Sequence, residues 1–172
     1  IQLCSSYGDH LLPTYFQPIP SFSRSHRNWC NLGSILHYHP HFLHQLHIEE
    51  SISIMDGQTS DGHYLPLIPA NTFQTRAKYY FLNDNILNCR ELSLEHIYHA
   101  SQQNVAKNES PSEDYALINA SALFSSKSKK INLSLGVRNL LNVSYIPHLS
   151  RLKSYEIPHV GRSYYLKLCL TL

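Results

Sequence analysis

The stretch that decides the fold reads YYLKLCLTL and occupies residues 164–172. Apolar and polar side chains alternate strictly along it: Leu166, Leu168 and Leu170 point one way, and Lys167 and Cys169 point the other. Successive side chains of a β-strand point to opposite faces of a sheet. A period of two therefore predicts a strand with one apolar and one polar face.

Six further segments alternate in the same way, although some do so weakly. They are residues 29–38, 46–54, 73–81, 90–99, 115–124 and 131–138. Glu50 interrupts the apolar face of the segment 46–54. No window of eleven residues shows a helical periodicity that rivals the strand-like alternation. The sequence therefore predicts an all-β protein of about seven strands.

The connections between these segments alternate in length. Short turns are expected at Pro40, at 82–88 and at 125–130, and longer loops at 56–65, 102–114 and 146–160. Asn, Ser, Gly and Pro in these stretches supply turn chemistry. Alternation of this kind places short turns at one end of the sheet and long loops at the other. Transmembrane β-barrels have this asymmetry.

Composition excludes several classes of protein. The chain has 172 residues, of which 42% are hydrophobic and 15% charged. A disordered chain would be rich in charge and poor in aromatic residues, so this composition argues against disorder. No window approaches the roughly 20 apolar residues of a transmembrane helix. The net charge is only +2, and the basic residues form no patch, so we expect no nucleic-acid partner.

No motif for a cofactor or for catalysis is recognisable. The cysteines are far apart and form no CxxC pair, which leaves no zinc knuckle or thioredoxin motif; they are Cys4, Cys30, Cys89 and Cys169. The sequence has no Gly-x-Ser-x-Gly elbow. Glu49 and Glu50 lie on opposite faces of a predicted strand and cannot cooperate locally. We expect neither a cofactor nor an enzyme.

Several motifs recur in the order of a known family. VRNLLN at 137–142, followed by Tyr145, is similar to an Asn-Leu-Phe-(Asp/Asn) element. NVAKNESPSEDYALIN at 104–119 is similar to E-x-P-T-x-x-Y-x-L-x-N, and LPLIPA at 65–70 to Leu-Pro-x-Ile-Pro-Pro. Tyr38-His39-Pro40 and the run 148–162 fit the same order. Together they resemble the C-terminal part of a TonB-dependent outer-membrane receptor. Leu172 replaces the family's terminal aromatic residue.

This resemblance implies an antiparallel up-and-down transmembrane β-barrel. About seven strands would be part of a barrel of about 22 strands. Residues 1–172 would be the C-terminal barrel portion, without the plug domain. Ile1 is not an initiator Met and no signal peptide follows it, so we expect the chain to begin inside a longer protein.

The resemblance also implies a function and partners. The receptor would lie in the bacterial outer membrane, among lipid and lipopolysaccharide. It would import a small, scarce nutrient: a ferric siderophore, haem, a metal ion or cobalamin. The TonB–ExbB–ExbD complex would act through the plug. Glu50 on a lipid-facing position would cost roughly 1–4 kcal/mol depending on depth, unless a bulge shifts the register there.

Histidines and arginines are the candidate site residues. Those in or near the long loops are expected ligand contacts: His63, His148, Arg151 and His159. A second set shares one face at the spacing of a strand and would suit a metal ion: His37, His39 and His41. Surface or lumen imidazoles are the alternative for both sets. The arginines would contact an anionic ligand or pair with Glu109, Asp114 or Glu156; they are Arg138, Arg151 and Arg162.

A second interpretation remains open at this stage. The chain would then be a soluble or secreted all-β binding module with a His-rich metal site. The two interpretations differ in where the apolar faces go. In a sandwich of two sheets the apolar faces meet in one core, whereas in a transmembrane barrel they face outward and leave a polar interior.

Overall fold

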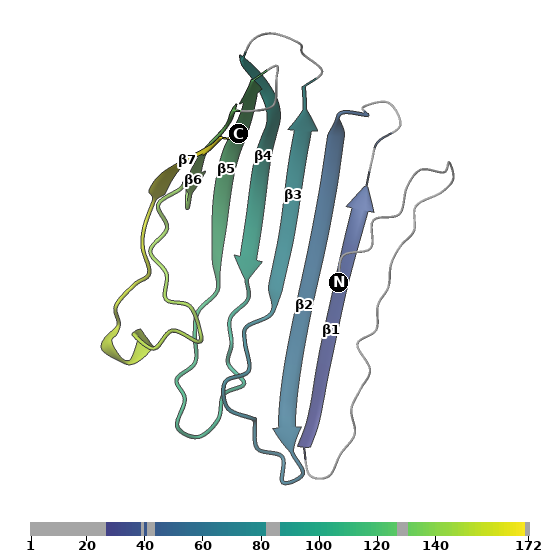
Figure 1. Ribbon diagram of the computed structural model, residues 1–172. Coiled ribbons are helices and arrows are strands. Elements are labelled where there is room, and N and C mark those ends of the chain that lie inside the picture. Colours follow the sequence, from purple (N-terminus) through teal and green to yellow (C-terminus); the bar gives the residue numbers. More distant parts are fainter. Residues whose placement is uncertain (1–26, 39, 41–43, 82–86, 127–130, 171–172) are drawn as a thin grey trace.

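The computed structural model describes residues 27–38, 40, 44–81, 87–126 and 131–170 (Figure 1). Seven strands form one sheet in the order β1-β2-β3-β4-β5-β6-β7, and each strand is antiparallel to the next. Their bounds are β1 Arg27–Tyr38, β2 Leu46–Thr59, β3 Thr72–Tyr80, β4 Leu87–His99, β5 Tyr115–Ser126, β6 Ile131–Arg138 and β7 Ser163–Leu170. A short 3₁₀ turn, η1, spans Lys153–Tyr155. No helix among the described residues is long and apolar enough to cross a membrane.

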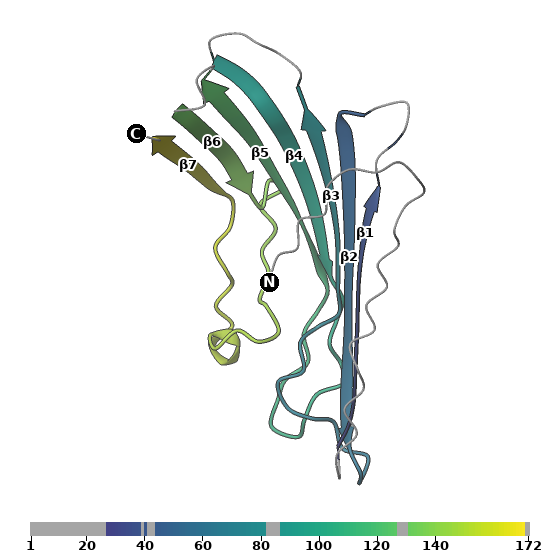
Figure 2. The ribbon, with the colours of Figure 1, turned by 45° about the vertical axis from the view of Figure 1, so that its right-hand side comes forward.

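The architecture confirms the predicted fold class. All seven predicted strands are present, and the sheet curves like a section of a barrel wall (Figure 2). Four strands are longer than predicted. The largest extensions are in β2, which continues to Thr59, and in β4, which begins at Leu87; β1 and β5 are each longer at one end. In the described part of the chain, β1 and β7 each have one strand neighbour. The sheet is therefore an open section of a barrel.

The connections differ in length at the two ends of the sheet. At one end, drawn at the bottom of Figure 1, residues 60–71, 100–114 and 139–162 join successive strands. At the other end the connections are shorter, at 39–45, 81–86 and 127–130. The predicted asymmetry is therefore confirmed. We call the first set the long loops.

One face of the sheet is apolar and uncovered. The strand register aligns apolar side chains across six strands in the row Ile48, Ala77, Leu94, Ala120, Val137 and Tyr164. Leu94 is 52% exposed and Leu166 is 68% exposed. Leu117 is the one buried residue with an aliphatic or aromatic side chain in the described part of the chain. No second layer of described residues therefore packs on this outward face to form a core.

The opposite, inward face is polar. Its central row crosses five strands and consists of His37, Glu49, Arg76, Glu95 and Asn119. The two faces alternate residue by residue, as the period of two requires. Glu49 therefore lies inward and Glu50 outward, as predicted. Tyr165 lies on the inward face beside Arg138, whereas Tyr164 lies outward and is exposed.

The register is regular at Glu50. Leu36 pairs with Glu50, and Glu50 pairs with Thr75, without a shift on either side. The bulge that would take Glu50 off the outward face is therefore absent. The irregularity of the described sheet lies instead in β4, between Cys89 and Glu91.

A buried asparagine ends β6. Asn139 has a left-handed backbone with φ 51°, which asparagine tolerates better than most residues, and is only 3% exposed. Its side-chain amide donates to the Val143 carbonyl and accepts from the Val143 N–H, at 2.8 Å each. Its backbone N–H donates to Oδ1 of Asn119, at 2.9 Å. The VRNLLN motif thus closes a turn and fastens it to β5.

Replacing Asn139 is expected to destabilise the protein in graded steps. Asn139→Ala leaves both Val143 groups without a partner and should lower the free energy of unfolding by roughly 1–3 kcal/mol. Asn139→Asp keeps the acceptor for the Val143 N–H but turns a buried carboxylate oxygen toward the Val143 carbonyl, so its loss should be at least as large. Urea unfolding in detergent micelles measures both variants. Equal stability of Asn139→Ala and the unsubstituted protein would contradict this role.

Candidate functional site

A buried histidine links two of the long loops. The His148 side chain is 3% exposed. Its Nδ1 lies 3.0 Å from Oγ of Ser112 and 3.1 Å from Nζ of Lys153. An ammonium group can only donate, so Nδ1 accepts and the ring proton of the neutral imidazole sits on Nε2. Nε2 faces Oε1 of Glu109 at 3.3 Å, without a well-directed hydrogen bond.

The charges around His148 keep it neutral. Burial lowers the pKa of His148, and the charge of Lys153 lowers it further, whereas Glu109 opposes both. Burial likewise lowers the pKa of Lys153, and Glu109 opposes that shift. A protonated His148 would lose its acceptor atom and place a second cation beside Lys153.

The same group also reaches the first long loop. Oε2 of Glu109 accepts from the backbone N–H of Leu67, at 3.3 Å. Gln102 donates to the carbonyls of Ile68 and Pro69, at 3.4 Å each. We call Glu109, Ser112, His148 and Lys153 the loop latch. It brings together the motif regions at 65–70, 104–119 and 148–162.

Four rings stack beside the latch. The ring centroids are separated by 4.7 Å from His99 to Tyr115, 4.5 Å from Tyr115 to Tyr145 and 5.4 Å from Tyr145 to His159. The Tyr145 hydroxyl also lies 3.0 Å from Nδ1 of His159. Burial raises the pKa of Tyr145, so its phenol stays protonated at neutral pH. The stack fixes the loop after β6 against β4 and β5.

A cleft of about 600 Å³ opens between the second and third long loops. Tyr115 and Tyr145 lie along it, together with one cation and three carboxylates: Lys153, Glu113, Asp114 and Glu156. The broad faces of both tyrosine rings are used in the stack, so only their edges are available to a ligand. The excess of carboxylates favours ligands that carry hydrogen-bond donors or positive charge.

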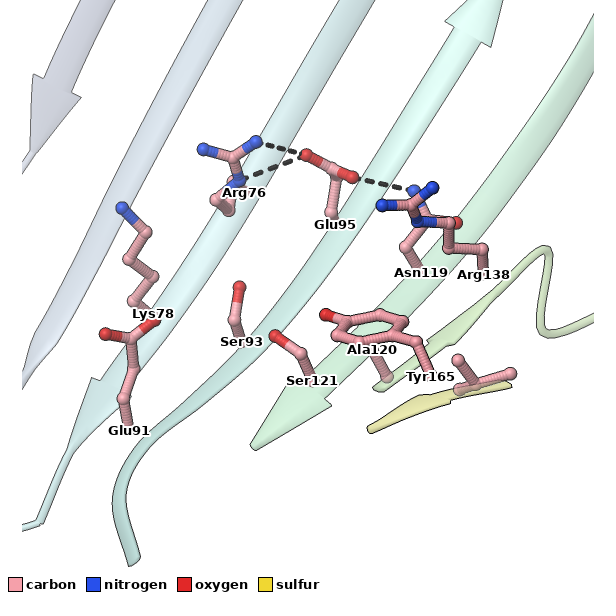
Figure 3. A pocket seen from close by; sticks show the side chains of 11 residues that line it. Arg76, Lys78, Glu91, Ser93, Glu95, Asn119, Ala120, Ser121, Arg138 and Tyr165 are labelled. Carbon is pink, nitrogen blue, oxygen red and sulfur yellow. Dashed lines mark hydrogen bonds and ion pairs between the residues drawn. The ribbon is translucent and has the colours of Figure 1, made fainter. Parts of the chain in front are cut away.

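The inward face carries a balanced charge network (Figure 3). Arg76 donates to Glu95 through Nε and Nη2, with Nε at 3.0 Å from Oε1, and Nη1 lies 3.4 Å from Glu49. Lys78 donates to Glu49 at 2.8 Å, and Asn119 donates to Glu95 at 2.7 Å. Two cations thus face two carboxylates. This network lies in the polar interior that the barrel interpretation requires.

A smaller cavity of about 300 Å³ adjoins this network. Tyr165 borders it, and the guanidinium carbon of Arg138 lies 5.5 Å from the centre of the Tyr165 ring (Figure 3). A Cβ atom at Gly136 would collide with that ring, so glycine is needed for Tyr165 to lie across β6.

The predicted ligand contacts occupy different surroundings. His148 is buried in the latch, whereas His63, Arg151 and His159 are exposed. His63 lies in the first long loop, where its carbonyl accepts from the backbone N–H of Thr59 at 2.8 Å. The other three belong to the third long loop, and the structure does not bring His63 to them through any contact between described residues. Ligand binding by these four residues stays a prediction.

The predicted metal set is only partly within the described chain. His37 is exposed on the inward face, with Nδ1 3.9 Å from Glu49. His39 and His41 lie outside the described residues. Among the described residues, no group of three or more His, Cys, Asp or Glu side chains could hold a metal ion. The ion pairs expected for Arg138, Arg151 and Arg162 are also absent among the described residues.

The sequence indicated several of the residues that form these clusters, but it did not indicate which residues contact one another. Arg76 and Glu95 stand at polar positions of predicted strands, but only the strand register pairs them. Ser112 and Lys153 lie within the motif regions 104–119 and 148–162, but nothing in those motifs marked either residue as a contact of His148. Glu109 belonged to a recognised motif, and its contacts with Leu67 and His148 could not be read from spacing.

Comparison with known proteins supports the fold. No family model and no curated protein matches the sequence. Among solved structures, the copper transporter OprC is similar, with a TM-score of 0.70 and 18% sequence identity over 83% of this chain. OprC is an outer-membrane barrel protein. The similarity therefore shows that the sheet has the fold of a section of such a barrel. The present chain spans 23% of the OprC chain.

The loop latch is expected to weaken in acid. Because folding lowers the pKa of His148, the latch stabilises the loops fully above the unfolded pKa of about 6.5. That stabilisation is lost as the pH falls from about 6.5 through the folded pKa. Hydrogen exchange at residues 100–114 and 139–162, corrected for its intrinsic pH dependence, should therefore rise in acid.

Two variants isolate the contribution of His148. His148→Gln should exchange with little pH dependence, since it does not titrate. His63→Gln removes an exposed histidine from the same end of the sheet and should behave like the unsubstituted protein. An unchanged pH dependence in His148→Gln would contradict the latch.

Proposed function

We propose that this chain forms part of the wall of an outer-membrane receptor that imports a scarce nutrient in a TonB-dependent manner. The observation that carries the proposal is the contrast between the two sheet faces. The outward face is apolar and uncovered, and the inward face is polar and internally paired. A sheet can cross lipid only if it closes and satisfies every backbone group. Further strands would therefore pair with the edges of β1 and β7.

The long loops would capture the nutrient at the outer surface. In this proposal the loop latch and the ring stack hold the second and third long loops around their cleft. His63, Arg151 and His159 offer exposed side chains at the same end. The TonB–ExbB–ExbD complex would act through a plug that lies outside these residues.

The nutrient class is a ferric siderophore, haem, a metal ion or cobalamin. Copper belongs in the panel of test ligands because the name of OprC assigns it copper transport. The residues described here do not favour a metal over the other nutrients, since they hold no metal-binding group of three or more side chains.

A soluble or secreted binding module is the competing proposal. It would need a second apolar layer over the outward face, and it would need the His-rich metal site. Exposed fractions of 52% for Leu94 and 68% for Leu166 argue against such a layer in the described part of the chain.

Nutrient uptake tests the proposal directly. The gene for the complete protein is deleted, and uptake of each candidate nutrient is measured under starvation for it, copper included. We expect one uptake activity to fall to background, to return with the complete gene, and to be absent when TonB is removed. The protein should sediment with the outer membrane and resist extraction by urea or carbonate.

Two results would contradict the proposal. One is recovery of the protein in a soluble fraction. The other is unchanged uptake of every nutrient in the panel, with the deletion verified and no second receptor gene present.

A further inference from the structure

Three polar residues form a row across the outward face. Glu50 of β2 pairs in register with Thr75 of β3, which pairs with His96 of β4. All three are exposed. The structure gives none of their side chains a hydrogen bond or an ion pair. An acid and an imidazole thus stand on either side of a hydroxyl.

This polar row interrupts a mostly apolar surface, on which Asp56, nearer the long-loop end of β2, is a second exposed carboxylate. The rows on either side of it hold Ile48, Ala77 and Leu94, and Ile52, Phe73 and Tyr98. Outward positions at 116–124 of β5, 131–137 of β6 and 164–170 of β7 carry no charged or imidazole group. An ionisable side chain within a membrane is costly without a partner, and it marks a functional site by default.

The row is complementary to itself. A two-fold axis along the membrane normal, passing beside Thr75, would bring Glu50 of one copy toward His96 of the other, and the reverse pair would form at the same time. Such an interface uses the same patch on both copies. The imidazole N–H would donate to the carboxylate, a charge-assisted hydrogen bond in a water-poor setting.

The surroundings of the row suit close approach of a second sheet. Thr75 and Ala77 are the small outward residues of β3, and small residues allow backbones to approach closely within a membrane. Ile52 and Leu94, on the two neighbouring strands, are larger apolar residues with exposed fractions of 37% and 52%. The patch therefore has a polar centre and apolar surroundings.

We propose that the outward face of β2, β3 and β4 is a lateral interface for a second copy of this protein, fixed by reciprocal Glu50–His96 contacts. This inference rests on the proposed function, because it requires the outward face to lie in the membrane. The self-complementary charge pattern favours a second copy over a different membrane protein.

Cysteine cross-linking in proteoliposomes tests the interface. The complete protein is purified, its native cysteines are replaced by serine, and Thr75→Cys is treated with a short bis-maleimide. Thr75 lies beside the proposed axis, so Thr75→Cys should give a covalent dimer. Ala122→Cys on the outward face of β5 lies away from the polar row, and Ser121→Cys lies on the inward face. Both should stay monomeric.

The charge pattern provides a sharper test. Glu50→Gln in the Thr75→Cys background removes the charge at both symmetric contacts and should lower dimer yield roughly tenfold or more. The double exchange Glu50→His with His96→Glu restores complementarity across the axis and should recover the yield. Cross-linking unaffected by Glu50→Gln would overturn the proposal, and so would equal cross-linking at Ala122→Cys.

A separate readout distinguishes failure of the interface from failure of the membrane assignment. In the same proteoliposomes, a spin label at Leu166 reports contact with lipid through its collisions with oxygen. A lipid-exposed label together with monomeric Thr75→Cys overturns the interface alone. A label shielded from lipid overturns both the interface and the proposed function.

Discussion

The rest of the structure depends on one constraint: a sheet of antiparallel strands presents alternate residues to opposite faces, and in this sheet the two faces differ in polarity. The backbone groups of the inner strands are paired within the sheet, so the side chains decide which face tolerates lipid. Apolar rows on the outward side and the network of Arg76, Glu95 and Glu49 on the inward side follow from the same register. A shift of one residue in any strand would exchange them.

The loops build on that register. The ends of β4, β5 and β6 lie side by side, so residues distant in sequence meet at the long-loop end. Glu109 thereby reaches both Leu67 and His148, and Asn139 reaches Asn119. Burial gives each of these groups its role: a buried neutral imidazole can accept from Lys153, and a buried amide can satisfy both backbone groups of Val143. The described loop residues are ordered by a few specific polar contacts and by the ring stack, without an apolar core of their own.

The strands were predictable because alternation is a local signal. The alternation is evident within single segments, such as YYLKLCLTL at 164–172 and INLSLGVR at 131–138. The opposite faces of Glu49 and Glu50 followed simply from their being adjacent residues of one strand. The site was less predictable because its contacts join distant segments. Nothing in the sequence distinguishes Lys153 from other lysines, and His148 looked like an exposed loop residue until the loops were folded around it. Glu50 was recognisable in the sequence as an exception to the apolar face of its strand. Its alignment with Thr75 and His96 could be seen only from the strand register.

The most direct test of the account is a comparison of two adjacent, similarly small residues of β5. Ala120 faces outward and Ser121 inward. Each is replaced by cysteine in the cysteine-free complete protein, spin-labelled, and reconstituted in lipid vesicles. We expect the label at 120 to collide mainly with oxygen, which partitions into lipid, and the label at 121 to collide mainly with a water-soluble nickel chelate. A label at 120 that meets the chelate as often as the label at 121, or that meets neither reagent, would contradict the central claim that this face of the sheet is solvated by lipid.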